Sequence, residues 1–84
     1  MTPVNVRVLG LAFRQRREKI GMTQETVAHD ADISTRHYQD IEAGRKGASL
    51  IIAIRISNAM NVSLQRIVNA AERLDATTGR VRRE

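Results

Sequence analysis

The two histidines of this sequence are its best candidates for acid-base or metal chemistry, and neither has the partners that such chemistry requires. The chain holds His29, His37 and no cysteine. A zinc site needs several converging thiolate, imidazole or carboxylate ligands. Nucleophilic catalysis needs a serine or cysteine arranged with a base and an acid. Neither pattern occurs, nor does a glycine-rich phosphate motif. We expect two surface histidines, no metal, no cofactor and no enzymatic activity.

Directed hydrogen bonding is the chemistry available between Ser34 and Glu42. Besides His37, the polar side chains inside this segment include Thr35, Arg36, Gln39 and Asp40. Arg36 and Asp40 are one helical turn apart, a spacing at which opposite charges attract. Thr35 and Gln39 can also be ordinary solvated residues. The segment can therefore bind a ligand or neutralise part of its own charge.

The charge of the chain indicates a polyanionic partner. The net charge is +5 and the pI is about 11.1, values typical of nucleic-acid binding. Residues 1–22 hold five Arg or Lys and one Glu, whereas residues 23–43 hold one Arg and five acidic residues. Cations that flank a reading segment are suited to phosphate contacts. The alternative is a solvated basic surface.

The polar segment belongs to a pair of short helices between Thr23 and Gly44. Val27 and Ala28 begin an apolar helical face. After a break, Tyr38 and Ile41 supply the apolar face of a second helix. Two short helices joined by a tight turn form a helix-turn-helix.

Capping residues mark where helices begin and end. Thr23, Ser34 and Ser49 can each cap a helix start, and Gly21 suits a helix end. We predict a first helix over Val8–Ile20 and a fourth over Leu50–Met60. Asn61 can end that helix in the left-handed conformation, and Ser63 can cap a fifth.

In this order and spacing, several motifs resemble the lambda-repressor-like, or XRE-type, family of DNA-binding domains. The resemblance covers about Leu9 to Leu74. Its motifs are MTQETVA, A-x-I-S at Ala31 to Ser34, Tyr38, IE-x-G at Ile41 to Gly44, and SLIIAIRISNAMNVSL at Ser49 to Leu64.

The sequence departs from the family pattern at three places. Asp32 stands where the turn usually has glycine, and Asp tolerates the left-handed conformation better than most residues. Gly47 and Ala48 lie in the loop after Gly44, where members of the family usually carry a proline before the next helix. Asp40 occupies a position where relatives often carry a neutral or basic residue.

The resemblance implies an all-α, compact five-helix domain containing the helix-turn-helix. We expect residues 1–8 to form an N-terminal arm or helix extension, residues 9–74 to form the domain, and residues 75–84 to form a mobile basic tail. With no cysteine, membrane-length apolar run or signal peptide, the chain is expected to be cytoplasmic, without membrane contact.

Base contacts are implied by the resemblance for Thr35, Arg36, Gln39 and Asp40, which would face the major groove. Arg36 can donate to guanine, Gln39 can read adenine, and Asp40 can accept from cytosine. Tyr38 is expected in the core.

Backbone contacts are implied for Gln24, Ser34, Arg45 and Lys46. Gln24 would bind a phosphate at the start of its helix, or would merely satisfy the helix end. The resemblance also implies a structural ion pair between Arg17 and Glu42. This pair would orient the recognition helix, which is the second helix of the helix-turn-helix and the one that faces the major groove.

A homodimer is expected because two small readers can bind adjacent half-sites. Leu50, Ala53, Ile54 and Ala59 are assigned to the core, as is Ile56 by resemblance. Ile51 and Ile52 make the fourth helix apolar around more of its circumference than one core face requires. The candidate dimer interface comprises Ile51, Ile52, Ile67, Ala71 and Leu74, although the last three can instead close the core.

The sequence thus predicts a sequence-specific regulator of transcription that binds double-stranded DNA, with repression as the expected action. Activation of transcription is the other action that this prediction allows, since an exposed face of the domain could contact the polymerase. The alternative from another class is a protein-interaction module, such as an antitoxin, whose main ligand is a protein partner.

Overall fold

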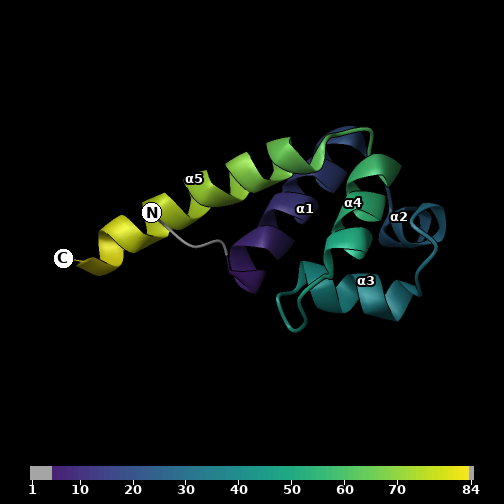
Figure 1. Ribbon diagram of the computed structural model, residues 1–84, viewed down its shortest axis with the longest axis horizontal. Helices are drawn as coiled ribbons and strands as arrows, with labels where there is room; N and C mark the ends of the chain where they lie inside the picture. Colours follow the sequence, from purple (N-terminus) through teal and green to yellow (C-terminus); the bar gives the residue numbers. More distant parts are fainter. Residues whose placement is uncertain (1–4, 84) are drawn as a thin grey trace.

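A computed structural model describes the backbone of residues 5–83 and the side chains of residues 5–76. Within that range it contains helices and no strand (Figure 1). The all-α, five-helix prediction is confirmed. The helices are α1 Val6–Ile20, α2 Gln24–Asp30, α3 Thr35–Glu42, α4 Leu50–Ala59 and α5 Leu64–Arg83.

Hydroxyl caps fix the helix starts as predicted. Thr23 Oγ1 accepts from the Thr26 amide at 3.1 Å, and Ser34 Oγ accepts from the His37 amide at 3.0 Å. The Ser49 and Ser63 hydroxyls do the same at 3.2 Å each. These bonds satisfy amides that have no partner inside a helix.

The first helix begins earlier than predicted, at Val6 rather than Val8. Asn5 explains the difference, because its Oδ1 accepts from the amides of Arg7 and Val8, both at 3.0 Å. Gly21 ends the helix with φ 74°, in the left-handed conformation expected there.

The core forms where α1 is packed between α3 and α5, with α2 and α4 closing the remaining side (Figure 1). Burying a large apolar side chain contributes about 1.5 to 3 kcal/mol, so this cluster supplies most of the driving force for folding. Its largest fully buried members are Tyr38, Phe13, Ile41, Ile56, Met60 and Val27.

On α4 the expected core face is partly wrong. Ala53 and Ile56 are buried as expected, but Leu50 is 69 % exposed and Ile54 is 39 % exposed. An apolar residue on every face leaves the inward side undetermined by periodicity alone. The helix turns Ala53 and Ile56 inward, which leaves the face of Leu50 and Ile54 in solvent.

The last helix continues past the expected boundary after Leu74. It runs to Arg83 and projects beyond the other helices (Figure 1). No proline interrupts this stretch, so nothing in the backbone stops the helix there. The side chains of the tail arginines lie outside the described residues.

Candidate nucleic-acid interface

A tight turn joins α2 to α3 and sets the angle between them. The Ile33 amide donates to the Ala28 carbonyl at 3.0 Å, and Asp32 has φ 60°. Asp32 therefore adopts the left-handed conformation that glycine usually supplies. Arg55 of α4 holds this turn from outside, donating to Asp32 Oδ2 at 3.1 Å.

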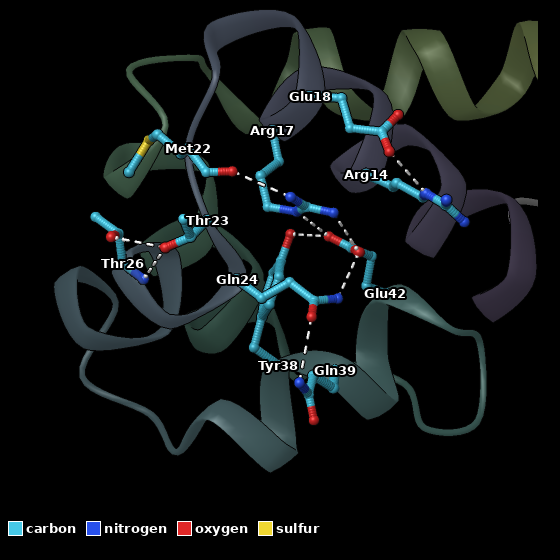
Figure 2. A network of polar contacts seen from close by, with 10 residues as sticks. All are labelled: Arg14, Arg17, Glu18, Met22, Thr23, Gln24, Thr26, Tyr38, Gln39 and Glu42. Carbon is cyan, nitrogen blue, oxygen red and sulfur yellow. Dashed lines mark hydrogen bonds and ion pairs between the residues drawn. The ribbon is translucent and has the colours of Figure 1, made fainter.

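Arg17 and Glu42 join α1 to the end of α3 (Figure 2). Arg17 Nε lies 2.8 Å from Glu42 Oε2, and Arg17 Nη2 lies 3.0 Å from Oε1. Arg17 Nη1 also donates to the Met22 carbonyl at 3.0 Å. A two-point contact between planar groups fixes orientation as well as distance. The ion pair that the family resemblance implies between Arg17 and Glu42 is thus present.

Glu42 collects two further donors. The Tyr38 hydroxyl donates to Oε2 at 2.6 Å, and Gln24 Nε2 donates to Oε1 at 2.8 Å. Burial alone would raise the pKa of Glu42, but the hydrogen bonds from Arg17, Tyr38 and Gln24 outweigh it and hold that pKa below its ordinary value. The carboxylate is therefore charged and fully bonded inside the fold.

The same contacts shift the pKa values of the two main partners of Glu42. Burial and then the hydrogen bond to Glu42 raise the pKa of Tyr38. The bond to Glu42 raises the pKa of Arg17. Tyr38 stays neutral and Arg17 stays charged at any physiological pH, so the network does not titrate there.

A glutamine pair extends this network toward the outer face of α3. Gln39 Nε2 donates to Gln24 Oε1 at 3.2 Å (Figure 2). The Gln24 amide is therefore bonded at both ends, to Glu42 and to Gln39. It links the buried carboxylate of Glu42 to the half-buried side chain of Gln39 on α3.

Of the four predicted base-contact residues on α3, Arg36 is the one with a highly exposed side chain. The Arg36 side chain is 86 % exposed, and Gln39 is half-buried. Thr35 is also half-buried at the first position of the helix. These three side chains lie on α3 next to Ser34, whose hydroxyl is occupied by its capping bond.

Asp40, which is predicted to contact a base, already has cationic partners within the chain. Its side chain is only 9 % exposed, and Oδ1 accepts from Arg45 Nε at 2.9 Å. Lys46 Nζ and Arg36 Nε lie farther away, at 3.7 and 3.9 Å from Oδ2. The hydrogen bond from Arg45 is the main cause that lowers the pKa of Asp40. A base contact by Asp40 would therefore compete with its hydrogen bond from Arg45.

The loop after α3 is folded back onto Asp40 by its backbone as well. The Arg45 and Lys46 amides donate to the Asp40 carbonyl at 2.8 and 3.2 Å, and Gly44 has φ 78°. Both cationic side chains are 63 % exposed. They form a fixed pair of cations beside α3.

Comparison with protein families matches residues 13–67, the greater part of the chain, to the model described as helix-turn-helix. The chain belongs to this family. It is an XRE-type helix-turn-helix protein with the lambda-repressor-like fold, and therefore a DNA-binding regulator of transcription. The matched region contains the Arg17 and Glu42 pair, the turn at Asp32 and the whole of α3.

Individual relatives agree with the family. Control protein C.MunI from a Mycoplasma species is 26 % identical over 73 residues, which are 87 % of this chain and 99 % of that protein. The clp gene regulator ClgR from Corynebacterium glutamicum has the same fold, with a TM-score of 0.91 and 23 % identity, and the match covers 98 % of this chain and 87 % of that one. The restriction-modification controller protein C.AhdI from Aeromonas hydrophila gives a TM-score of 0.72 and 21 % identity, and the match covers 74 % of this chain and 94 % of that one.

Within this helix-turn-helix protein the candidate dimer residues separate into two groups. Ile51 is 64 % exposed, whereas Ile67 is 2 % exposed and Ala71 is fully buried. Ile67 and Ala71 pack inside the core of one chain, so their side chains are not available to a partner. Ile52 and Leu74 are half-buried at the edge of the core. The expectation is corrected at Ile67 and Ala71.

Three contributors to the helix-turn-helix site were not identified from the sequence. They are the Tyr38 hydroxyl on Glu42, the bond between Gln24 and Gln39, and the clamp from Arg55 to Asp32. The last two join residues from different helices, so no local spacing marks them, although Asp32 at a usual glycine position signals that a compensating partner is needed. Tyr38 and Glu42 are one helical turn apart on α3, and that i,i+4 spacing could have suggested the first contact.

In the described part of the chain no helix is long and apolar enough to cross a membrane. No group of three His, Asp or Glu residues converges there as a metal site.

Proposed function

We propose that this helix-turn-helix regulator is cytoplasmic, binds a specific double-stranded DNA operator as a homodimer, with α3 in the major groove, and represses transcription by occupying a promoter. The observation that carries the proposal is the two-sided arrangement of α3. Its inner side is locked by the buried Glu42 network, while Arg36 is 86 % exposed and half-buried Gln39 lies at the outer end of that network. A rigid helix whose polar side chains keep hydrogen-bonding capacity to spare is suited to reading base edges.

Arg36 and Gln39 are the proposed base readers, with Thr35 beside them. Arg36 can donate two hydrogen bonds to guanine, and Gln39 can form a pair with adenine. Gln24 holds the Gln39 amide in a defined orientation before DNA arrives. Fixing one side chain in advance reduces the entropy lost on binding.

Phosphate contacts are proposed for Ser34, Arg45 and Lys46, which lie at the two ends of α3. Gln24 Nε2 already donates one N–H to Glu42, so a phosphate contact by Gln24 would use its second N–H. Phosphate contacts strengthen binding to any duplex and make it fall as salt rises. The two loop cations therefore act on affinity, and the α3 side chains act on sequence preference.

We propose that a second copy of the chain packs against the exposed apolar face of α4. Leu50 and Ile51 are both more than half exposed, and Ile54 lies one turn farther along the same face. Exposed apolar clusters of this kind mark interaction surfaces. A dimer would present two copies of α3 to adjacent half-sites of a two-fold symmetric operator.

Selection from a randomised duplex pool with the purified protein, at a stated moderate salt concentration, tests this function. A two-fold symmetric motif with half-sites one helical turn apart is expected. A folded protein that enriches no motif, or binds all duplexes with the same salt-sensitive affinity, would contradict sequence-specific regulation. It would favour the protein-interaction module instead.

A further inference from the structure

A groove of about 190 Å³ lies between α1 and α5 and is separate from the DNA-reading helix. It shares no lining residue with the pocket beside Gln24 and Gln39. Both α3 and α5 pack on α1, and Figure 1 shows α5 along the side of α1 away from α3. A ligand in the groove would therefore leave α3 accessible.

The groove combines an apolar floor with a cationic rim. Ala12, Val62 and Ile67 form the buried part of the floor. The rim carries Arg16, Lys19, Arg66 and Arg73, while no acidic residue is found among its described lining. In that same described part of the chain, no salt bridge neutralises Lys19 or Arg66, and both are exposed. Lys19 and Arg66 thus present exposed positive charge on the rim.

Arg16 is held in place at the edge of the groove. Its Nε donates to the Met60 carbonyl at 3.1 Å and its Nη2 to the Asn61 carbonyl at 3.0 Å. A guanidinium has five N–H donors, so further donors remain for a ligand. Because these bonds fix the side chain, less entropy is lost when it binds a carboxylate.

We propose that this groove binds an acidic, amphipathic segment of a partner protein. Apolar side chains of the segment would occupy the floor, and its carboxylates would bind Arg16, Lys19 and Arg66. A polynucleotide is less well matched, since no aromatic side chain lines the groove to stack on bases. The proposal does not depend on the identity of the operator or on dimer formation.

Chemical shifts of the ¹⁵N-labelled protein would locate the binding of a synthetic helical peptide with leucine on one face and glutamate on the other. The same peptide with glutamine in place of glutamate controls for apolar contact alone. A single-stranded oligo-dT is the nucleic-acid probe. Three variants are compared: Lys19→Gln, Arg66→Gln, and Arg14→Gln, which makes a matched charge change on α1 outside the groove.

The expected result is a shift of amides along the groove with the glutamate peptide, and weaker shifts with the glutamine peptide. Lys19→Gln and Arg66→Gln should each weaken binding about threefold, the scale of an exposed charge pair, whereas Arg14→Gln should change it little. The protein bound to duplex DNA should still take up the peptide.

Two results would overturn the proposal. Equal weakening by Arg14→Gln would show attraction to the general positive charge rather than to this groove. Shifts in the groove with oligo-dT but not with the peptide would assign it to nucleic acid. A missing DNA motif leaves this test unaffected, so the two failures are distinguishable.

Discussion

Arg17 Nε and Nη2 donate to the two carboxylate oxygens of Glu42, at 2.8 and 3.0 Å, and so connect α1 to the last residue of α3. The Arg17 side chain is 15 % exposed and that of Glu42 is 5 % exposed. Removing one partner of a pair this buried leaves a charge without its main compensation. The pair is consequently more important for holding the position of α3 than for the net stability that its formation adds.

Arg17→Ala should lower the free energy of unfolding by about 3 kcal/mol, because Glu42 stays buried without its bidentate donor. Urea denaturation would measure it, and duplex affinity should fall with it. Arg17→Lys keeps the charge but not the planar fork, so it should recover only part of the loss. Arg14→Ala is the control, since its pair with Glu18 is exposed. Unchanged stability and affinity in Arg17→Ala would contradict the assigned role.

Gly10→Ala should push α3 away from α1. A Cβ at Gly10 would lie 2.5 Å from the carbonyl oxygens of Ile41 and Glu42, which are backbone atoms that cannot move alone. We expect a loss of about 1 to 3 kcal/mol, typical of overpacking, and weaker DNA binding in the remaining folded protein. Thermal unfolding and duplex titration would measure the two effects.

Gly21→Ala provides the comparison for Gly10→Ala. It introduces left-handed strain at φ 74° but meets no atom within 4 Å. It should cost about 1 kcal/mol while leaving the affinity of the folded protein for DNA unchanged. Equal effects of both variants on affinity would show that the distance between α1 and α3 does not matter for binding.

Acid should destabilise the protein through Glu42 and Asp40. Both carboxyl groups have a folded-state pKa below the ordinary values of 4.5 and 3.8. A depressed pKa adds stability that is complete above the ordinary value and is lost as pH falls through the folded value. The free energy of unfolding should therefore decline below about pH 4.5. Glu42→Gln should flatten that decline; an identical acid profile would contradict it.

Alkaline pH should act through Tyr38 with the opposite sign. Its folded-state pKa is raised above the ordinary value of 10.0 by burial and by the bond to Glu42. The stability tied to the neutral phenol is present below that value and is lost as pH rises toward the folded pKa. Tyr38→Phe should remove this alkaline loss, as measured by unfolding at stepwise higher pH.

Asp40→Asn distinguishes a residue that positions the loop from one that reads a base. Releasing Arg45 and Lys46 should raise affinity for random duplexes several-fold at low salt, because two cations lose their neutralising partner. The selected base preferences should stay the same at every position. Asp30→Asn gives the same charge change on α2 away from the loop. Loss of preference at a single base pair would instead restore Asp40 as a reader.

Ile51→Asp should convert the proposed dimer to a monomer without unfolding the chain, since this side chain is 64 % exposed and contributes little to the core. Sedimentation equilibrium would report the oligomeric state, and circular dichroism the fold. Leu11→Asp is the control, because it adds the same charge at an exposed apolar position on α1. A dimer that persists in Ile51→Asp places the interface elsewhere.

The sequence allowed prediction of the fold because its signals are local. Hydroxyl caps at Thr23, Ser34 and Ser49, together with Gly21, fix where helices start and stop with little help from distant residues. The start of α1 was missed because the Asn5 cap was not recognised.

The environment of α3 was harder to predict, because it depends on which side of a helix faces a neighbour. The family pattern places Asp40 on the outer face, yet Arg45, five residues later in the following loop, donates a hydrogen bond to its carboxylate. Likewise, α4 has apolar residues around much of its circumference, so the exposure of Leu50 and Ile54 follows only from how the helix packs. Contacts between helices, such as that of Gln24 with Gln39, produce no periodic pattern in the sequence from which they could be predicted.

Base reading by Arg36 and Gln39 on α3 can be tested by repeating the randomised-duplex selection with Arg36→Ala and Gln39→Ala. Each variant should lose preference at one or two symmetric positions of the motif while keeping the rest, at a cost of about 1 to 3 kcal/mol for the lost base contact. If both variants select the same motif as the unaltered protein with equal discrimination, α3 does not read the operator through these residues.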